Sequence, residues 1–251
     1  MGRPPPRLGR TVGPLAILFD LDDTLLANPM DTFVPAYFRA LTSFMAGELP
    51  PRLLIEQLLL ATRAMDANRD PARTNEQAFA DAFFPGLGRD PDELQPVFER
   101  FYRDAFPGLR GMTAPVAGAR EAVGWALGGG RQVVIATNPL FPRTAILQRM
   151  EWAGLTLDEL PIAVVTTYEN MHATKVRPAY YLEVAERLGR RPSECVMVGD
   201  NWTWDVAHSV AAGMAAWWIA APQAAAPDPD LEILGQGTLA EFLAFARREW
   251  G

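Results

Sequence analysis

The 251-residue sequence contains a single cysteine, Cys195, so no disulfide can form within the chain and folding needs no oxidising compartment. Basic residues are also scarce: 23 Lys and Arg stand against 30 Asp and Glu, a formal charge of −7. This balance disfavours nucleic acid and anionic membrane surfaces as partners. No apolar run approaches the roughly 18 residues of a membrane span. The first 13 residues are basic and proline-rich but lack the apolar segment of a secretory signal, so we expect a loose tail on a cytoplasmic protein.

Hydrophobic residues make up 49% of the sequence, and the mean hydropathy is −0.01, as in ordered globular proteins. Short and mostly continuous apolar runs predict buried parallel strands. These runs are Leu15 to Phe19, Val133 to Ala136, Ile162 to Val165, Val196 to Val198 and Ala215 to Ile219. Helical patterns fall between or after the later runs, at Ala119 to Leu127, Arg143 to Ala153, Ala179 to Leu188 and Thr238 to Arg248. The alternation predicts an α/β fold with a doubly wound parallel sheet.

About a hundred residues separate the first predicted strand from the second, whereas a crossover between parallel strands needs only a dozen or more. Helical stripes fill this interval. One runs from Phe33 to Met45, others cover Leu53 to Met65 and Glu76 to Phe84, and a fourth begins after the Asp90 cap. We therefore expect an inserted domain of four helices over residues 28–111, with the α/β core formed by residues 14–27 and 112–251. The aromatic residues of the stripes fit the core of the bundle.

The segment ILFDLDDTLL places Asp20 directly after the first strand, with Asp22 and Asp23 on the following turn. Open α/β sheets bind ligands at the carboxyl ends of their strands. Carboxylates this close repel one another unless a cation or a hydrogen-bond network compensates. Capping of the next helix is the other interpretation of these aspartates.

Three further strand ends carry polar residues. Thr137 and Asn138 end the second strand, where a hydroxyl and free N–H groups suit a phosphate, although Thr-Asn-Pro is also an ordinary turn. Lys175 precedes the helix opened by Pro178, and a lone loop lysine is usually solvated. Asp200 follows the tight glycine Gly199, and Asp205 comes five residues later.

In this order, the motifs DLDDT, TN, K and GDNWTWD resemble those of the haloacid dehalogenase-like hydrolase superfamily. The helical insertion lies where subfamily I carries its type C1 cap. The resemblance implies a Rossmann-like core with an inserted helical cap domain and covers most of the chain. Two positions depart from the usual pattern, because Pro139 follows the Thr-Asn pair and Val176 follows the lysine. Both changes alter the backbone near the expected phosphate.

The resemblance implies a chemistry, since phosphatases and phosphomutases have the aspartate at position 22 and dehalogenases lack it. Asp20 would attack phosphorus to form an aspartyl-phosphate, and Asp22 would be the general acid and base. Mg²⁺ would be held by Asp20, the backbone carbonyl of Asp22, and Asp200. The remaining roles fall to two groups: Thr137, Asn138 and Lys175 would bind phosphate, and Thr24, Gly199 and Asp205 would support the site.

The sequence thus predicts a magnesium-dependent phosphatase of small phosphorylated metabolites, as a monomer or homodimer. A phosphomutase is the alternative, and nothing in the motifs separates the two. A receiver-like signalling module or a non-catalytic phosphate-binding protein fits less well, because the presumed nucleophile comes first and every motif position is filled. Trp202 and Trp204 fit either the pocket entrance or packing. His172 fits either substrate contact or an exposed loop.

Overall fold

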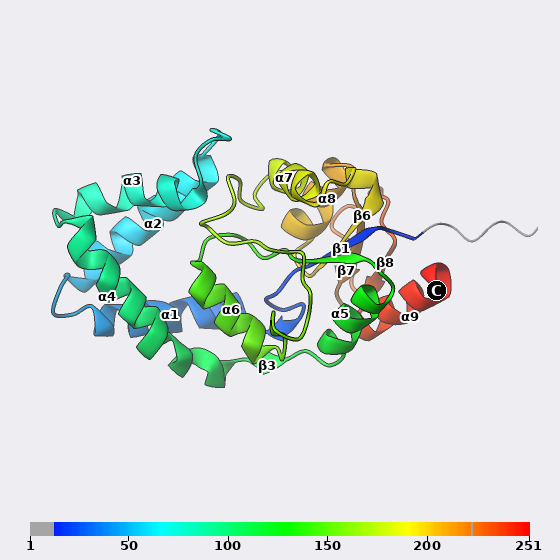
Figure 1. Ribbon diagram of the computed structural model, residues 1–251, viewed down its shortest axis with the longest axis horizontal. Helices are drawn as coiled ribbons and strands as arrows, with labels where there is room; N and C mark the ends of the chain where they lie inside the picture. The colour runs from blue at the N-terminus through cyan, green and yellow to red at the C-terminus, as the bar shows by residue number, and fades with distance from the viewer. Residues whose placement is uncertain (1–12, 222) are drawn as a thin grey trace, which may run out of the picture.

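The computed structural model of the chain describes residues 13–221 and 223–251. A parallel sheet with its covering helices occupies one end, and a group of helices occupies the other (Figure 1). Of the predicted N-terminal tail, residues 1–12 lie outside the described residues. In the described ranges, no helix is both long and apolar enough to cross a membrane.

The main sheet, as far as the described residues go, has six parallel strands in the order β5-β4-β1-β6-β7-β8. Their bounds are β1 Ala16–Phe19, β4 Gln132–Ile135, β5 Val164–Val165, β6 Cys195–Gly199, β7 Ala215–Ile219 and β8 Gly235–Gly237. β1 lies between β4 and β6, with Phe19 opposite Ile135 and Val198. The carboxyl ends of these three strands are therefore neighbours.

Strand residues alternate between two hydrophobic clusters on opposite faces of the sheet. Ile17 and Phe19 belong to a cluster with residues of α5, α6 and α9, whereas Ala16 and Leu18 belong to one with residues of α7. A strand covered on both faces buries both sets of its side chains. The helices of this part are α5 Ala119–Gly128, α6 Arg143–Trp152, α7 Ala179–Leu188, α8 His208–Ala211 and α9 Leu239–Trp250.

The five predicted strands are present, although β5 is two residues shorter than expected. The predicted helices are present too, and Gly154 and Gly189 end α6 and α7 with left-handed φ angles of 75° and 64°. The sequence did not predict β8, because Gly-Gln-Gly has no apolar run. It also did not predict the short helical turns η1 Phe106–Met112, η2 Pro192–Glu194 and the π-helical η3 Trp202–Ala207.

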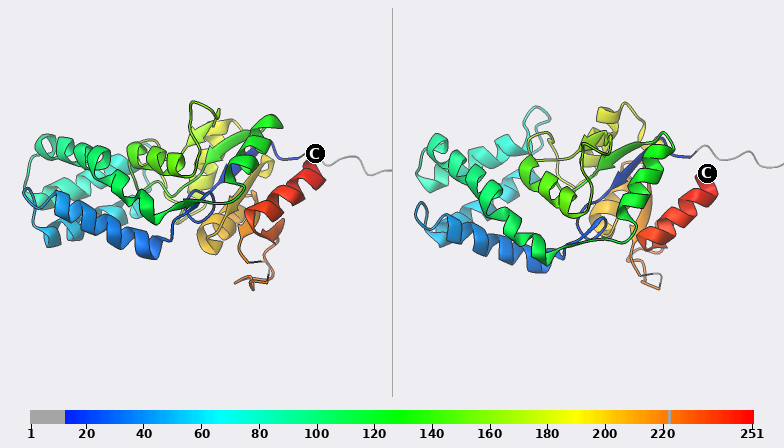
Figure 2. Two further views of the ribbon diagram at one scale, coloured as in Figure 1. Left: turned by 90° about the horizontal axis from the view of Figure 1, so that it is seen from below. Right: turned by 60° about the horizontal axis from the view of Figure 1, so that its bottom comes forward.

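The helical insertion, residues 28–113, lies between β2 Leu26–Ala27 and β3 Ala114–Pro115. These two short strands pair antiparallel, so the chain leaves and returns at one point. The four predicted helices are present in it, as α1 Met30–Phe44, α2 Pro51–Ala67, α3 Asn75–Leu87 and α4 Pro91–Asp104. The insertion and the C-terminal helix α9 lie at opposite ends of the molecule in every view (Figure 2).

Local signals explain where these helices begin. Thr74 and Gln77 form a capping box at the start of α3. The Asp90 side chain accepts a hydrogen bond from the Asp92 N–H at the start of α4, and Pro91 is the first helical residue. The predicted stripe of α1 is buried at Phe33, Tyr37 and Leu41, as an amphipathic helix requires.

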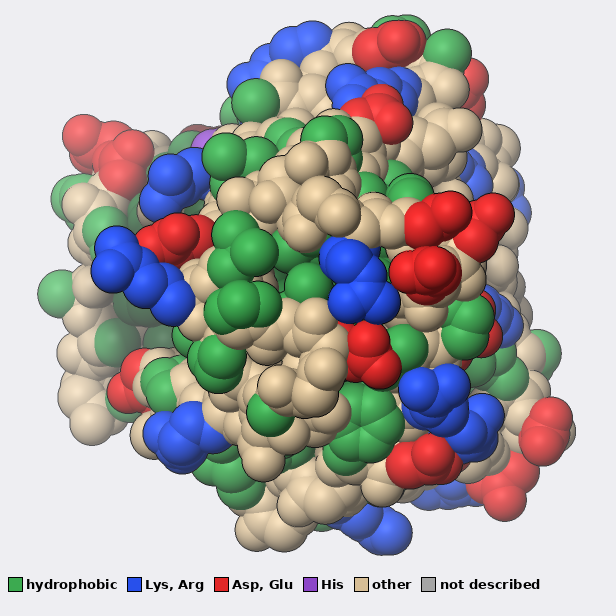
Figure 3. Space-filling view, turned by 90° about the vertical axis from the view of Figure 1, so that its left-hand side faces the viewer, with side chains coloured by type: hydrophobic (Ala, Val, Ile, Leu, Met, Phe, Trp, Pro, Cys, Tyr) green, Lys and Arg blue, Asp and Glu red, His purple; other side chains and the backbone are tan. Residues whose placement is uncertain are grey.

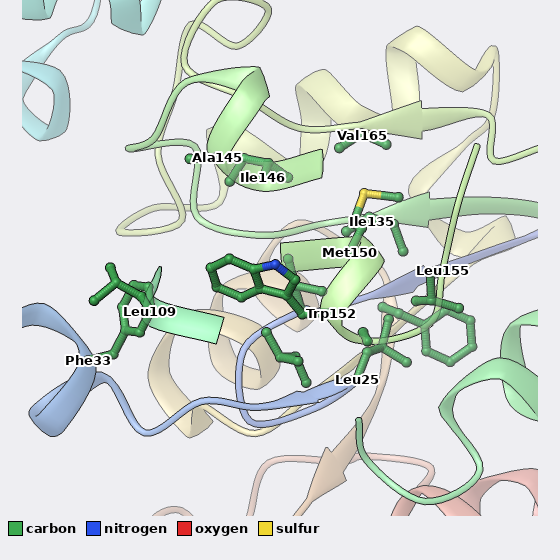
Figure 4. Packing of buried hydrophobic residues seen from close by; sticks show 14 of the residues in the cluster. Leu25, Phe33, Leu109, Ile135, Ala145, Ile146, Met150, Trp152, Leu155 and Val165 are labelled. Atoms are coloured by element: carbon green, nitrogen blue, oxygen red, sulfur yellow. The ribbon is translucent and has the colours of Figure 1, made fainter. Parts of the chain in front are cut away.

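Contacts in two regions join the insertion to the α/β part. In the first, the rings of Phe106 and Trp152 stack 5.4 Å apart within a cluster that continues from Phe33 to β4 and α6 (Figure 4). In the second, the α2–α3 loop binds the segment before Lys175. There, Asn68 Nδ2 donates to the carbonyl of His172 at 3.1 Å. Contacts at η1 and at the α2–α3 loop thus hold the insertion over the carboxyl ends of the strands.

Candidate active site

The polar residues predicted at separate strand ends lie together at one end of the sheet. Asp20 follows β1, and its N–H donates to the Val198 carbonyl of β6 at 2.9 Å. On the other side, the Ala136 N–H donates to the Phe19 carbonyl at 2.7 Å, which extends the β1–β4 pairing to the residue before Thr137. Asp200 follows directly after β6. The parallel register alone thus brings the first, second and fourth motifs side by side.

Lys175 connects the third motif to this group. Its Nζ donates to Asp20 Oδ1 at 2.5 Å and to Asp205 Oδ1 at 2.6 Å. The lysine side chain is 2% exposed, so it is a buried cation rather than a solvated loop residue. A buried ammonium is stable only when anionic partners surround it, and two carboxylates do so here.

Burial, together with the excess of carboxylates over the single ammonium, shifts the pKa values of the group. Burial, and then the neighbouring Asp205 carboxylate, raise the pKa of Asp200 to about 7. Burial by itself lowers the pKa of Lys175, but the carboxylates of Asp20 and Asp205 outweigh it and raise that pKa well above its ordinary value. Lys175 therefore stays charged, and negative charge remains beside it.

The donor set fits a divalent metal ion that prefers oxygen. Carboxylate oxygens of Asp20, Asp200 and Asp205 all lie within 4.8 Å of one another. Mg²⁺ takes oxygen ligands and would neutralise the excess charge. The group includes two of the three predicted ligands, Asp20 and Asp200. The third predicted ligand is the backbone carbonyl of Asp22. The Asp22 carboxylate is not part of the group.

The turn after Asp20 has an unusual backbone. Asp23 has a φ angle of 55°, the one left-handed non-glycine residue in the described ranges. Its N–H donates to the Leu26 carbonyl at 2.6 Å, and its carboxylate accepts the Asn28 N–H at 2.8 Å. Thr24 is fully buried, with Oγ1 3.5 Å from Asp200 Oδ1. The hydrogen bonds of Asp23 and Thr24 thus stabilise the backbone conformation of the first motif.

Asp22 points to a second set of partners. Its Oδ2 lies 2.5 Å from Arg149 Nη1 of α6, and its Oδ1 accepts from Asn28 Nδ2 at 2.7 Å. The Arg149 side chain is 1% exposed and lies 4.7 Å from the ring centre of Phe141. Its Nε and Nη2 have no hydrogen-bond partner in the described part of the chain. Asp22 is therefore held by an ion pair beside the Asp20 cluster.

The phosphate-binding candidates lie on loops fixed by hydrogen bonds. Asn138 Oδ1 accepts from the Lys175 N–H at 3.1 Å and so joins the second motif to the third. Thr137 is 3% exposed, and its carbonyl accepts from Thr166 Oγ1 at 2.8 Å and from the Tyr180 hydroxyl at 3.1 Å. The Thr137 hydroxyl, the Asn138 amide and the Lys175 ammonium thus lie on two loops that a hydrogen bond joins.

Gly199 is required by packing against Asp205. A Cβ atom at position 199 would lie 2.3 Å from Asp205 Oδ2, which leaves no room for any side chain. The same Oδ2 accepts the Asn201 N–H at 3.0 Å, while Oδ1 accepts from Lys175. The fourth motif therefore positions Asp205 from two sides.

The conspicuous residues near the motifs have different surroundings. Trp202 packs edge-on against Trp218 at 5.0 Å, and Trp204 is 40% exposed. His172 is partly buried, and its Nδ1 lies 2.8 Å from Glu183 Oε1. The Trp202 contact favours the packing interpretation, and His172 is neither fully exposed nor bonded to a motif residue.

Sequence reasoning missed two features of this site. Arg149 was not singled out, although an arginine beside Met150 and three residues after Ile146, both apolar positions of a predicted helix, signals a buried partner. Lys175 is the only lysine of the sequence, since every other Lys or Arg position is an arginine. This lone ammonium among guanidinium groups marks a position where a compact charge is needed.

Comparison with known proteins gives the following matches. Residues 14–213 match the family model of the haloacid dehalogenase-like hydrolases. No curated protein matches the sequence.

Among solved structures, a 2-haloacid dehalogenase from Pseudomonas syringae pv. tomato DC3000 is similar, with a TM-score of 0.62 and 23% identity over 96% of this chain and 100% of the other. A HAD phosphatase from Thermococcus onnurineus has a TM-score of 0.52 and 24% identity, over 94% and 99% of the two chains. A HAD family hydrolase from Deinococcus radiodurans R1, with bound phosphate and sodium, has a TM-score of 0.53 and 22% identity, over 94% and 97%. Likeness at these identities shows a shared fold.

Proposed function

We propose that this chain, which belongs to the haloacid dehalogenase-like hydrolase family, is a magnesium-dependent phosphatase of small phosphorylated metabolites. One observation carries the proposal: the Asp20 carboxylate binds the Lys175 ammonium and belongs to a cluster of acidic oxygens suited to a cation. An anionic nucleophile can approach an anionic phosphoryl group only where such positive charge compensates.

Asp20 acts as the nucleophile in this proposal. A carboxylate oxygen attacks phosphorus, the bond from phosphorus to the leaving oxygen breaks, and an aspartyl-phosphate forms. Asp22, which takes up a proton when it leaves Arg149, gives that proton to the departing alkoxide. In the second step Asp22 takes a proton from water, the resulting hydroxide attacks phosphorus, and inorganic phosphate leaves Asp20 as a free carboxylate.

The surrounding residues bind and orient the phosphoryl group. Thr137 and Asn138 supply a hydroxyl and an amide, and Lys175 supplies a fixed positive charge that is already bound to Asp20. Asp205 and Gly199 hold that ammonium in place. Asp20, Asp200 and the backbone carbonyl of Asp22 would hold Mg²⁺, with the Asp205 carboxylate beside them, and the bound ion would supply charge neutralisation and orientation of the phosphate oxygens.

The Asp22–Arg149 pair defines the resting position of the general acid and base. Asp22 must rotate from Arg149 toward the leaving oxygen to transfer a proton, and Asn28 and Arg149 are the groups it returns to. The helical insertion, as a cap over this end of the sheet, would exclude bulk water during the reaction. It would also restrict the substrate to small molecules.

The test is a phosphate-release assay on a panel of phosphorylated metabolites with and without Mg²⁺. We expect turnover of at least one compound, abolished by a chelator and reduced at least about a thousandfold by Asp20→Asn. Asp31→Asn, an exposed aspartate of α1, is the matched control and should leave turnover unchanged. Equal release by the Asp20→Asn and wild-type proteins would refute the aspartyl nucleophile.

The same assay separates the alternatives. A phosphomutase would convert a sugar phosphate to its isomer with little release of inorganic phosphate. A dehalogenase would release halide from a 2-halo acid and would not need Asp22. Asp22→Asn should lower phosphatase turnover by about a hundredfold or more, which is the usual contribution of general acid and base catalysis.

A further inference from the structure

A cavity of about 290 Å³ lies among the four helices of the insertion and the loop after the second motif. Residues of α1, α2, α3 and α4 line it together with residues 140–142 and Tyr168. Most of the wall is aromatic or aliphatic, and its rings include Tyr37, Phe38, Phe79, Phe83, Phe98 and Phe141. Nothing in the proposed phosphoryl transfer itself uses this cavity.

The cavity lies next to the proposed catalytic groups. Leu140 belongs to its wall and is three residues after Thr137, a reach of at most about 11 Å along an extended chain. Phe141 belongs to the wall as well, and its ring lies 4.7 Å from the guanidinium of Arg149, which binds Asp22. The cavity is therefore on the side of Asp22, the group proposed to protonate the leaving oxygen.

Three polar side chains of the wall have their hydroxyls satisfied within the protein. The hydroxyls of Tyr37 and Tyr102 bind each other at 2.9 Å, and Thr62 Oγ1 donates to the Leu58 carbonyl at 2.8 Å. A ligand rich in hydroxyls would lose its bonds to water there and find few replacements. Glu76 is in the wall too, and its carboxyl disfavours a second anionic group on the ligand.

Resting on the phosphatase activity proposed above, we propose that this cavity binds the uncharged apolar group, aryl or alkyl, of a phosphate monoester. Apolar cavities of about 150 Å³ take up one benzene ring, so this one has room for about two rings or a chain of similar volume. Aromatic walls bind such groups by burial and by edge-to-face contacts. Sugar phosphates and compounds with a second acidic group are excluded as the preferred substrates.

The surface agrees with a small substrate. The outer end of the insertion shows acidic and basic side chains interspersed, with no field of one sign across the visible face (Figure 3). A large phosphorylated partner would find no charged surface to guide it there.

The first experiment compares kcat/KM for 2-phenylethyl phosphate and glucose 6-phosphate, which both have a primary alkoxide leaving group. We expect at least about a tenfold preference for the phenylethyl compound. Equal or better turnover of glucose 6-phosphate would overturn the assignment of the cavity while leaving the phosphatase intact. If neither compound is hydrolysed, the proposed function fails for this pair. Calorimetry then measures the affinity of the Asp20→Asn protein for the two compounds, and tighter binding of 2-phenylethyl phosphate is the result that the cavity assignment requires.

The second experiment fills the cavity. Ala80→Trp, in the wall, should raise KM for 2-phenylethyl phosphate at least about tenfold with little change in kcat. Ala46→Trp, an exposed position of the same insertion, is the matched control and should change neither. If Ala80→Trp does not fold, Phe79→Ala replaces it and should shift the preference toward 1-naphthyl phosphate over phenyl phosphate. Unchanged KM in the folded Ala80→Trp protein, or unchanged preference in Phe79→Ala, would refute the proposal.

Discussion

Arg149 Nη1 lies 2.5 Å from Asp22 Oδ2, and this ion pair joins α6 to the turn after β1 across 127 residues of sequence. The guanidinium is buried, and the carboxylate is 14% exposed. A charge buried this deeply depends on its partner, since loss of one member leaves the other without compensation. The pair therefore belongs to the fold as well as to the site.

Arg149→Met should lower the free energy of unfolding by about 3 kcal/mol, because Asp22 loses its cation and keeps only Asn28. The double variant Asp22→Leu/Arg149→Met should recover a large part of this loss. Urea denaturation of the two single variants and the double variant measures the coupling. Additive losses in the double variant would show that the two side chains do not stabilise each other.

Lys175 is the only lysine, so lysine chemistry reports on this site alone, apart from the terminal amine. Because its side chain is 2% exposed and bound by two carboxylates, the native protein should resist reductive methylation at Lys175 and react there once unfolded. Mass spectrometry of the peptide containing residue 175 measures the modification. Rapid methylation of the folded protein would contradict the buried ion-pair geometry.

Lys175→Arg should not rescue turnover, because a planar guanidinium does not fit the position of a compact ammonium between Asp20 and Asp205. We expect turnover at least about a hundredfold below that of the wild type, similar to that of Lys175→Met. Arg39→Lys, an exchange at an exposed position of α1, is the control. Wild-type turnover by Lys175→Arg would show that charge alone suffices.

Stability should depend on pH through Asp200. The pKa of Asp200 in the folded protein, about 7, lies above the ordinary value of 3.8. Its contribution to the free energy of unfolding is therefore fully present below about pH 4 and is lost as pH rises through 7. A bound divalent cation neutralises the ionised Asp200 carboxylate and so restores the stability that is lost at high pH. Saturating Mg²⁺ should therefore raise Tm more at about pH 8 than at about pH 5.5.

Thermal unfolding with Mg²⁺, against a potassium salt of equal ionic strength, measures this difference. At one fixed concentration, a hundredfold above the Kd measured at about pH 8, the cation should add about 2.7 kcal/mol to the free energy of unfolding there and less at about pH 5.5. Asp200→Asn should lose most of that gain. An equal gain in the wild type at both pH values, or in Asp200→Asn, would refute the assignment of Asp200 as a ligand.

Gly199→Ala should abolish turnover, because the new Cβ meets Asp205 Oδ2 at 2.3 Å and displaces a partner of Lys175. Gly124→Ala is the matched control. Gly124 is an exposed residue of α5, and a Cβ atom there would have no atom within 4 Å. That control should keep its turnover and gain about 0.5–1 kcal/mol in stability, because alanine is the better helix former. Equal turnover in both variants would show that the position of Asp205 is unimportant.

Local patterns in the sequence were sufficient to predict most of the strands and helices and their order. Continuous apolar runs marked β1, β4, β6 and β7, while steps of three and four residues marked the helices of the insertion. Because parallel strands end at one side of a sheet, the same patterns also predicted that Asp20, Thr137 and Asp200 would be neighbours. β8 and the π-helical turn were missed, since neither has an apolar period of its own.

Only the tertiary structure decided which side chains meet across the fold. It paired Asp22 with Arg149, placed Lys175 between Asp20 and Asp205, and enclosed a cavity by residues from four helices and a loop. The physical reason is that periodicity reports which face of an element is buried. Which partners that face meets depends on the distances and angles between elements, which no local pattern contains.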